Sequence, residues 1–299
     1  MPELPEVETI RLDLVNDLLK KKIITLKILS PKTVKNTKSF FLKQLLNNSF
    51  EDISRRGKLL YFKIKGGDNY LLIHLKMTGQ LIYLKGKKKI AGGHSLALIS
   101  NDKRTSFIQD VGGELPNRYT RVFFLFEDEA QLFFNDLRRF GYLKIVNKKE
   151  LDQILEKNYG PEPLTKNFNK EYLFNIFKNR QRSIKSLLLD QKIVAGLGNI
   201  YVDESLFLAG ILPDRLAKEL KIEEIDKLVK SVNSIIKLAI KNRGTTFKDY
   251  RDASGKQGNF SQYLRVYGRA GEKCFKCGGI IEKKKHAGRG THYCLKCQK

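Results

Sequence analysis

Four cysteines near the C-terminal end form two C-x-x-C pairs that are separated by sixteen residues. Two such turns can bring four thiolates onto one ion, and this spacing is typical of a tetrahedral zinc ribbon rather than of four unrelated thiols. Because four protein ligands leave no position for water, the ion would be structural. The sequence therefore predicts one structural Zn²⁺ ion and no organic cofactor, with the ligands Cys274, Cys277, Cys294 and Cys297.

A second candidate site is the start of the chain, where Pro2 follows Met1. If Met1 is removed, Pro2 gains a secondary α-amine whose ordinary pKa is about 8, well below the ~10.4 of lysine. Part of this amine would be a neutral nucleophile at pH 7, with Glu3 and Glu6 nearby for acid–base work. Two alternatives stay open at this point. A Met-Pro start is common without any function, and acidic residues in a first helical turn also complement the helix dipole.

A third candidate is the stretch Gly196-Leu197-Gly198-Asn199, which precedes an apolar helical run from Ile200. Backbone N–H groups at a helix start between glycines can bind a phosphate. A plain capped turn between two helices explains the same residues more simply.

The elements that must position these groups differ between the two halves of the chain. Apolar residues from Val7 to Leu18 recur at helical spacing and predict an amphipathic helix directly after Pro2. From about residue 23 to 146, short β-rich runs between turn residues predict a β-sandwich. The clearest of these runs are 59–63, 70–75, 121–126 and 131–135. Polar segments rich in Lys and Gly at 85–89 and 101–120 are expected to be loops.

After about residue 150 the pattern becomes helical. Apolar runs at 172–177, 184–189 and 200–208 and a long stripe over 225–239 predict a set of packed helices. A stretch containing Gly and Asn at 248–260 then leads to the cysteine module.

The charge of the chain favours a polyanion as partner. There are 57 Lys and Arg residues against 32 Asp and Glu, which gives a formal net charge of +25. Residues 241–299 alone hold fifteen Lys and Arg against four Asp and Glu. A lysine-rich proteome would also place lysine on every solvated face, so charge alone favours nucleic acid only slightly.

Three observations indicate a cytoplasmic protein without a membrane partner. The first twenty residues hold five acidic residues and no apolar block, unlike a signal peptide. No segment approaches the roughly 20 apolar residues of a membrane span. The paired cysteines indicate a metal site in a reducing compartment rather than disulfides.

These motifs also occur together in one family. The opening MPELPEVET resembles that of the formamidopyrimidine-DNA glycosylases, and further landmarks of this family follow in order along nearly the whole chain. These are RGK at 56–58, HLKMTG at 74–79, DLRRFG at 136–141, IK at 184–185, VAGLGNIY at 194–201, QGNF at 257–260, VYGR at 266–269 and GRGTHYC at 288–294.

The resemblance implies an α+β multidomain fold that binds damaged double-stranded DNA in a cleft between domains, as a monomer. The implied domains are an N-terminal catalytic β-sandwich with flanking helices (1–150), a helix-two-turn-helix domain (151–247), a lesion-capping loop region (248–263) and a zinc-ribbon finger (264–299). The implied activity is removal of oxidised purines such as 8-oxoguanine and formamidopyrimidines, followed by nicking of the abasic site.

The resemblance also assigns catalytic roles. Pro2 would attack the sugar C1′ and form an iminium, with Glu3 as proton donor and Glu6 in support. Lys58 would serve the first elimination, and Arg289 the second.

Other positions would contact the DNA. Because the target nucleotide must leave the stacked duplex, the family inserts three side chains into the gap, which here are Met77, Arg138 and Phe140. Core packing for the two apolar residues and a solvated strand for Arg138 would be the alternatives without the flanking motifs. The remaining expected DNA contacts are His74, Tyr119, Arg180, Lys185, Asn199, Tyr267 and Lys283, besides Lys58 and Arg289.

Several positions depart from the family pattern. Asn117-Arg118-Tyr119-Thr120 stands where a histidine-containing stretch is usual, which puts the contact at Tyr119 in doubt. The connection over 85–120 is longer than usual, Lys76 replaces a common glycine, and Leu295 replaces a frequent proline. Two alternatives are an endonuclease VIII-like glycosylase for oxidised pyrimidines and a non-catalytic damaged-DNA-binding protein. The Leu4 context, the Arg138/Phe140 pair and the loop over 248–260 favour the purine branch, and the intact catalytic set disfavours a non-catalytic protein.

Overall fold

The computed structural model describes residues 1–93, 114–245 and 260–299. The chain divides into two compact units. The first consists of Met1–Ile154 with Arg243–Asn259, and the second of Leu155–Asn242 with Phe260–Lys299. The domain boundaries expected at 150, 247 and 263 stay predictions, and most of the expected lesion-capping loop lies outside the described residues. Among the helices that the structure describes, none has the length and apolar character needed to cross a membrane.

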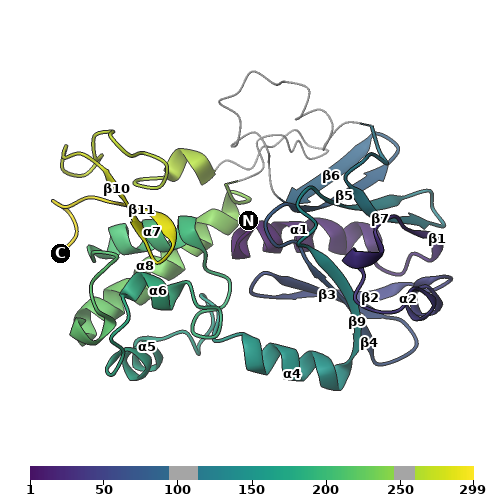
Figure 1. Cartoon of the computed structure of the whole chain (residues 1–299), viewed down its shortest axis with the longest axis horizontal. Coiled ribbons are helices and arrows are strands. Elements are labelled where there is room, and N and C mark those ends of the chain that lie inside the picture. The colour runs from purple at the N-terminus through teal and green to yellow at the C-terminus, as the bar shows by residue number, and fades with distance from the viewer. Residues whose placement is uncertain (94–113, 246–259) are drawn as a thin grey trace. The chain divides into compact units, whose positions relative to one another are not determined.

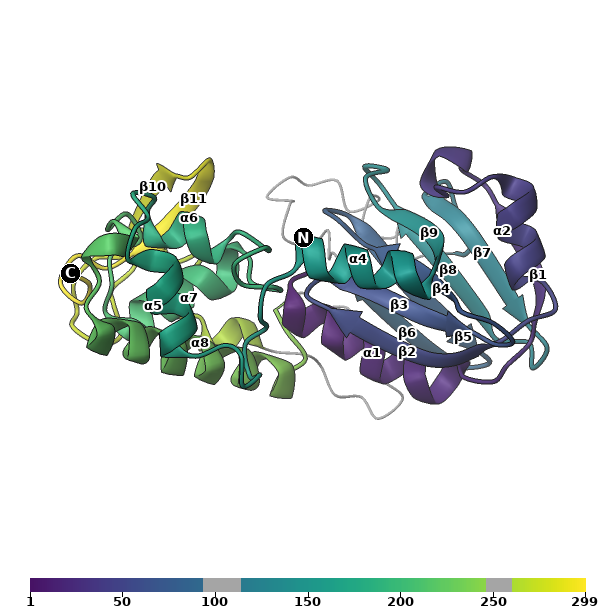
Figure 2. The same ribbon diagram turned by 90° about the horizontal axis from the view of Figure 1, so that it is seen from below.

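The first unit is built on two antiparallel sheets, as the short β-rich runs predicted (Figures 1 and 2). One sheet has the order β1-β7-β8-β5-β6 and the other the order β2-β3-β4-β9. Buried side chains from both sheets form one hydrophobic core. The strands are β1 (Ile23–Ile28), β2 (Phe50–Arg56), β3 (Leu59–Ile64), β4 (Asn69–His74), β5 (Gly79–Lys85), β6 (Lys88–Gly93), β7 (Thr120–Phe126), β8 (Gln131–Asp136) and β9 (Tyr142–Asn147).

Helix α1 (Leu4–Leu18) forms where the helical spacing predicted it. Its buried face packs against β2 and β6, the edge strands of the two sheets, so the helix joins the sheets along one side (Figure 1). Contact is close at Gly92, where an added Cβ would lie 2.1 Å from a side-chain carbon of Ile10. The start of α1 is thereby held against the β-sandwich, which fixes the position of Pro2 and Glu3.

Two parts of the first unit differ from expectation. The segment 85–89 is a tight hairpin and not a loop, because β5 runs to Lys85 and β6 begins at Lys88. A short helix α2 (Lys38–Leu45), capped by Thr37, lies within the region expected to be only β-rich. It buries only Phe41 and Leu45, so its helical period is barely expressed in the sequence. A 3₁₀ turn, η1 (Pro31–Thr33), precedes it.

The second unit is helical, and its C-terminal part is a small hairpin. Helix α4 (Lys148–Asn158) leads from the first unit into the second. The other elements are α5 (Lys170–Phe177), α6 (Ile184–Leu188), α7 (Asn199–Ala209), η3 (Ala217–Glu219), α8 (Ile222–Lys241), η4 (Phe260–Tyr263), β10 (Glu282–His286) and β11 (Arg289–Tyr293). The long stripe predicted over 225–239 is the buried face of α8, which packs against α5 and α7.

Candidate functional site

The start of the chain is buried and held by Glu6. Pro2 is buried, and Glu3 and Glu6 expose only 4% and 1% of their surfaces. The backbone N–H of Glu3 donates to Glu6 Oε2 at 2.9 Å. The other oxygen, Glu6 Oε1, accepts the backbone N–H of Thr245 at 2.9 Å and its hydroxyl at 3.2 Å. One carboxylate therefore fixes both the peptide beside Pro2 and a residue that is distant in sequence.

Residues 243–245 attach to α1 at a second point as well. Arg243 Nη2 lies 2.6 Å from Asp13 Oδ2. Gly244 has a φ of +78°, and a Cβ there would lie 2.5 Å from Glu6 Oε1. Only glycine therefore suits this position, where the chain leaving α8 passes directly over the catalytic carboxylate candidate.

Lys58 belongs to the β2–β3 turn and is tied to α1 through its neighbours. Gly57 turns the chain with a φ of +58°, and Lys58 exposes only 4% of its surface. Arg55 donates to the carbonyl of Gly57 at 2.9 Å and to Glu8 Oε2 at 2.8 Å. Burial acts to raise the pKa of Glu8, but hydrogen bonds from Arg11 and Arg55 outweigh it and the net pKa is lowered. A charged Glu8 thus couples the turn that carries Lys58 to the helix that carries Glu3.

The three expected intercalating residues stand on two neighbouring loops of the first unit. Met77 lies between β4 and β5, and Arg138 and Phe140 lie between β8 and β9. Met77 and Phe140 expose 37% and 53% of their surfaces, which excludes core packing for them. The Arg138 guanidinium lies 4.7 Å from the centre of the Phe140 ring, a cation–π contact.

Asp136 holds these two loops together, a role that the motif match did not reveal. It is buried, and its Oδ1 accepts the hydroxyl of Thr78 at 2.5 Å and the N–H of Arg138 at 3.2 Å. Its Oδ2 accepts the N–H of Gly141 at 2.7 Å. An added Cβ at Gly141 would lie 2.6 Å from the ring of Phe134. The loop is therefore braced from beneath while Arg138 and Phe140 point outward.

His74, at the end of β4, is a neutral side chain. Burial first, and then the charges of Lys76 and Lys58, lower its pKa to about 3. Its Nδ1 accepts the backbone N–H of Lys76 at 3.0 Å, so the proton of the neutral ring is assigned to Nε2. Lys76 has a φ of +51°, which is the physical reason why glycine suits this position. Tyr119, the doubtful contact, exposes only 7% of its surface, and the Arg118 guanidinium lies 4.9 Å from the centre of its ring.

The four cysteines of the second unit converge. All four Sγ atoms lie within 4.8 Å of one another. A tetrahedral site with Zn–S bonds of about 2.3 Å separates its sulfurs by about 3.8 Å, so the donor set fits one Zn²⁺ ion. A hydrogen bond from the Gly279 backbone is the largest cause that lowers the pKa of Cys277, to about 7, whereas burial raises the pKa of Cys294 and Cys297.

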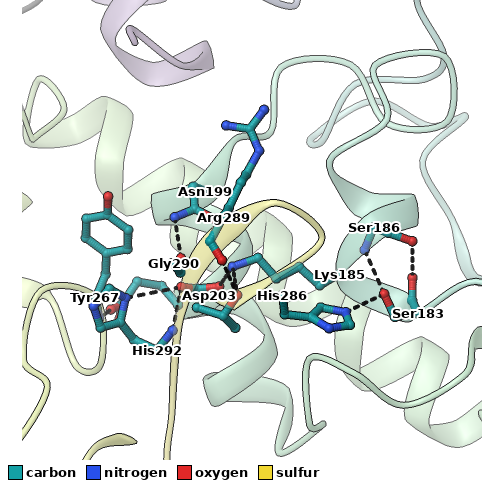
Figure 3. Close-up of polar contacts among 12 residues, drawn as sticks. Ser183, Lys185, Ser186, Asn199, Asp203, Tyr267, His286, Arg289, Gly290 and His292 are labelled. Carbon is teal, nitrogen blue, oxygen red and sulfur yellow. Dashed lines mark hydrogen bonds and ion pairs between the residues drawn. The ribbon is translucent and has the colours of Figure 1, made fainter. Parts of the chain in front are cut away.

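The N-terminal part of α7 is bonded to the β10–β11 hairpin (Figure 3). Asn199 Nδ2 donates to the carbonyl of Gly290 at 2.8 Å. Asp203, one turn further along, pairs with Lys185 at 2.5 Å, and both side chains are fully buried. The structure thus places the ammonium of Lys185 in an internal ion pair, and a DNA contact there stays a prediction.

A second carboxylate of α7 fixes the chain before the cysteine module. Buried Glu204 accepts the backbone N–H groups of Arg265, Val266 and Tyr267 at 2.8 to 2.9 Å. Burial raises the pKa of Glu204, against the lowering effect of these three bonds. The Tyr267 ring lies 5.0 Å from that of His292. Sequence reasoning missed Asp203 and Glu204, although two adjacent acids in an otherwise apolar helix are a usable signal of buried function.

The remaining predicted contacts are exposed residues of the second unit. Lys283 lies on β10, Arg289 begins β11, and Arg180 follows α5. Figure 3 shows the Arg289 side chain extending away from the polar cluster around Asp203. Exposed cations at these positions have the chemistry of phosphate-binding groups.

Three family models match the chain. The formamidopyrimidine-DNA glycosylase N-terminal domain matches residues 1–143, the H2TH domain of the same family matches 159–251, and the zinc finger found in FPG and IleRS matches 271–299.

Proteins of known family match this chain over its whole length. The formamidopyrimidine-DNA glycosylase of Carboxydothermus hydrogenoformans is 39% identical, with all of both chains covered. Among solved structures, a Lactococcus lactis FPG variant with DNA containing Fapy-dG is 34% identical, with a TM-score of 0.85 and complete coverage of both chains. The wild-type Lactococcus lactis protein with DNA containing an oxidised pyrimidine has the same identity and coverage and a TM-score of 0.83.

Proposed function

Because the chain belongs to the formamidopyrimidine-DNA glycosylase family, we propose that its reaction begins at the amine of Pro2. The family consists of bifunctional DNA glycosylases and AP lyases of base excision repair that act on oxidised purines, with damaged DNA as the partner and one structural Zn²⁺ ion. What is proposed for this chain is the set of residues that carry each step. The assignment of a monomer and of the cytoplasm stays a prediction.

The first step is displacement of the damaged base. After removal of Met1, the lone pair of the Pro2 nitrogen attacks C1′, and the glycosidic bond breaks as the base leaves. Glu3 supplies a proton for base loss or for opening of the sugar ring. As the ring opens, the Pro2 nitrogen loses its proton and the ring oxygen O4′ gains one, and an iminium between Pro2 and C1′ remains. Glu6, which holds the Glu3 peptide at 2.9 Å, is assigned to orient this end of the chain.

The next steps break the DNA backbone. The iminium withdraws electrons, so loss of a proton from C2′ expels the 3′ phosphate in the first elimination, which we assign to Lys58. A second elimination expels the 5′ phosphate, which we assign to Arg289. Water then hydrolyses the link to Pro2.

The DNA contacts are assigned from the family resemblance, and the exposure of Met77, Arg138 and Phe140 supports the assignment of these three. Met77 and Phe140 are proposed to fill the gap that the flipped nucleotide leaves, and Arg138 to satisfy the acceptors of an orphan cytosine. Asn199, Tyr267, Lys283, Arg180 and neutral His74 are proposed as phosphate contacts. We propose 8-oxoguanine and formamidopyrimidines opposite cytosine as preferred lesions.

The observation that carries the nucleophile assignment is the buried start of the chain, where Pro2 precedes Glu3 and Glu6 on a docked helix. Sodium borohydride should reduce the iminium and leave the protein joined to lesion DNA through a peptide that begins at Pro2. Protein that keeps Met1 should not trap, since its proline nitrogen is an amide.

Two variants test the roles separately. Pro2→Gly, a primary amine, should trap weakly and turn over poorly. Glu3→Gln should lose base excision but still nick abasic sites, where no base has to leave. Trapping through a lysine in protein with a confirmed Pro2 terminus would refute the assignment. Release of thymine glycol faster than 8-oxoguanine would contradict the proposed preference.

A further inference from the structure

We infer that Asp203 is a positioning residue that, together with Lys185, fixes strand β11 and thereby the place of Arg289. The inference deepens the proposed function, because it rests on the assignment of Arg289 to the second elimination. Asp203 lies on α7, where it pairs with Lys185 and accepts a backbone N–H of β11, so its effect on Arg289 would pass through the backbone of that strand.

The contacts fall on three consecutive residues directly after Arg289. Asn199 donates to the carbonyl of Gly290 at 2.8 Å. Lys185 Nζ donates to the hydroxyl of Thr291 at 2.8 Å. Asp203 Oδ2 accepts the backbone N–H of His292 at 2.9 Å. The strand that presents Arg289 is therefore held at successive residues by side chains from α6 and α7.

Of the three side chains that hold β11, Asp203 is the one that both contacts the strand and pairs with Lys185 in the interior. Lys185 and Asp203 are both fully buried, and their Nζ and Oδ1 atoms lie 2.5 Å apart. Removing one partner of such a pair leaves an uncompensated buried charge, which is strongly destabilising, whereas removing both charges together is often tolerated. The pair can thus be replaced as a unit, and the backbone contact to His292 can be tested by itself.

Arg289 itself is linked to this set through its carbonyl, which accepts the hydroxyl of Thr291 at 3.3 Å. It is exposed at the first position of β11, opposite His286 across the hairpin turn. The glycines on either side give the backbone freedom, since Gly288 has a φ of +72°. A displacement of about 1 Å can cost on the order of 100-fold in rate, so the place of β11 matters for any step that uses Arg289.

Two charge-free double variants form a matched pair. Lys185→Met/Asp203→Asn removes the buried charges but keeps an oxygen that can accept the His292 N–H. Lys185→Met/Asp203→Leu removes the charges and the acceptor. The full chain with zinc and a confirmed Pro2 terminus would be assayed on an abasic-site duplex. The DNA products of the first and second eliminations would be separated and quantified. Borohydride trapping would be measured in parallel.

The Leu variant should complete the second elimination about 10- to 100-fold more slowly than the Asn variant, which carries the same Lys185→Met change. Trapping and the first elimination should agree within about twofold between the two variants, because both carry the same Lys185→Met change. Hydrogen exchange should show a protected His292 amide in the Asn variant and fast exchange in the Leu variant, a readout that does not depend on catalysis. Glu224→Gln, which breaks the more exposed pair with Arg215 in the same unit, serves as control and should change none of these.

The outcomes separate this inference from the proposed function. If the two double variants behave alike in elimination or exchange, Asp203 does not position β11 and the inference fails. If both lose trapping and zinc together, the pair only supports folding, and the inference also fails. Arg289→Ala tests the underlying assignment, because an unchanged second elimination in that variant would refute the role of Arg289 itself.

Discussion

Several carboxylates of this protein link segments that are distant in sequence, and most of them are not expected to take part in catalysis. Glu6 joins the chain start to Thr245, Glu8 joins α1 to the turn of Lys58, and Asp136 braces the loop of Arg138. Each accepts hydrogen bonds from groups on two or more segments. Buried acceptors of this kind are costly to remove, because their donors lose their partners.

His74 gives a residue-scale prediction, since it is expected to bind phosphate without carrying charge. A neutral N–H donor releases no counterion, so His74→Gln should weaken DNA binding and leave the salt dependence of affinity unchanged. Lys283→Ala should reduce the slope of log K against log salt by about 1. Binding titrations with a fluorescent abasic-analogue duplex at salt concentrations from about 50 to about 200 mM would measure the affinity and the slope for each variant. A reduced slope for His74→Gln would mean that the ring is protonated in the complex.

The same lowered pKa predicts a pH effect on stability. Below about 6.5 the unfolded chain takes up a proton at His74, whereas the folded chain resists protonation until about pH 3. The free energy of unfolding should therefore fall as the pH drops from about 6.5 towards 3. His74→Gln should remove this part of the slope in urea unfolding, and an unchanged slope would contradict the low pKa.

At the scale of elements, the loop between β8 and β9 depends on the buried carboxylate beneath it. In Asp136→Asn the amide can no longer accept both the Thr78 and Gly141 bonds, so we expect a loss of about 1–3 kcal/mol in the free energy of unfolding. The preference for 8-oxoguanine opposite cytosine over adenine should fall several-fold, as in Arg138→Ala. Excision rates on the two duplexes measure this.

Asp152→Asn is the matched control, because Asp152 is half exposed in an i,i+4 pair on α4. It should change neither stability nor preference by a measurable amount. An Asp136→Asn protein that is destabilised but keeps the full preference would show that the brace does not control Arg138.

Elements with a strong period were predictable from sequence, and those with a weak or interrupted one were not. The apolar stripes of α1 and α8 predicted which face of each helix is buried, and the β-rich runs between turn residues predicted β3, β4, β7 and β8. Helix α2 escaped notice because it buries only two residues. The hairpin at 85–89 was not predicted, because a polar sequence of Lys and Gly residues is also typical of a loop.

The candidate site shows the same division. The cysteine spacing predicted its own cluster, because four ligands at two turns leave little freedom. Two adjacent acids in apolar α7 could have marked Asp203 and Glu204 as buried groups. Their partners and those of Asp136 could not be named from sequence, because many of them are backbone N–H groups that only the tertiary structure brings close. The resemblance located Lys185, but only the structure places it in a buried ion pair with Asp203.

At the scale of the molecule, the two units allow a prediction for zinc. Cys294→Ser should release the ion and weaken DNA binding, because the hairpin bearing Lys283 and Arg289 belongs to the unit that holds the cysteines. The β-sandwich should stay folded, with unchanged hydrogen exchange in β2, β3 and β8. Metal analysis should give one zinc per chain before the substitution. Active protein without zinc, or collapse of the β-sandwich on zinc loss, would contradict this.

The bonds between Glu6 and Thr245 span 239 residues of sequence, and this distance sets an order of events during biosynthesis. At about 5–20 residues per second, a ribosome needs roughly 12 to 50 seconds to reach residue 245. The bonds that complete the setting of the chain start cannot form before then. Met1 can thus be removed from an accessible nascent terminus, before Pro2 is enclosed in its finished setting. The late return of residues 243–245 to the first unit therefore leaves time to expose the amine of the proposed nucleophile.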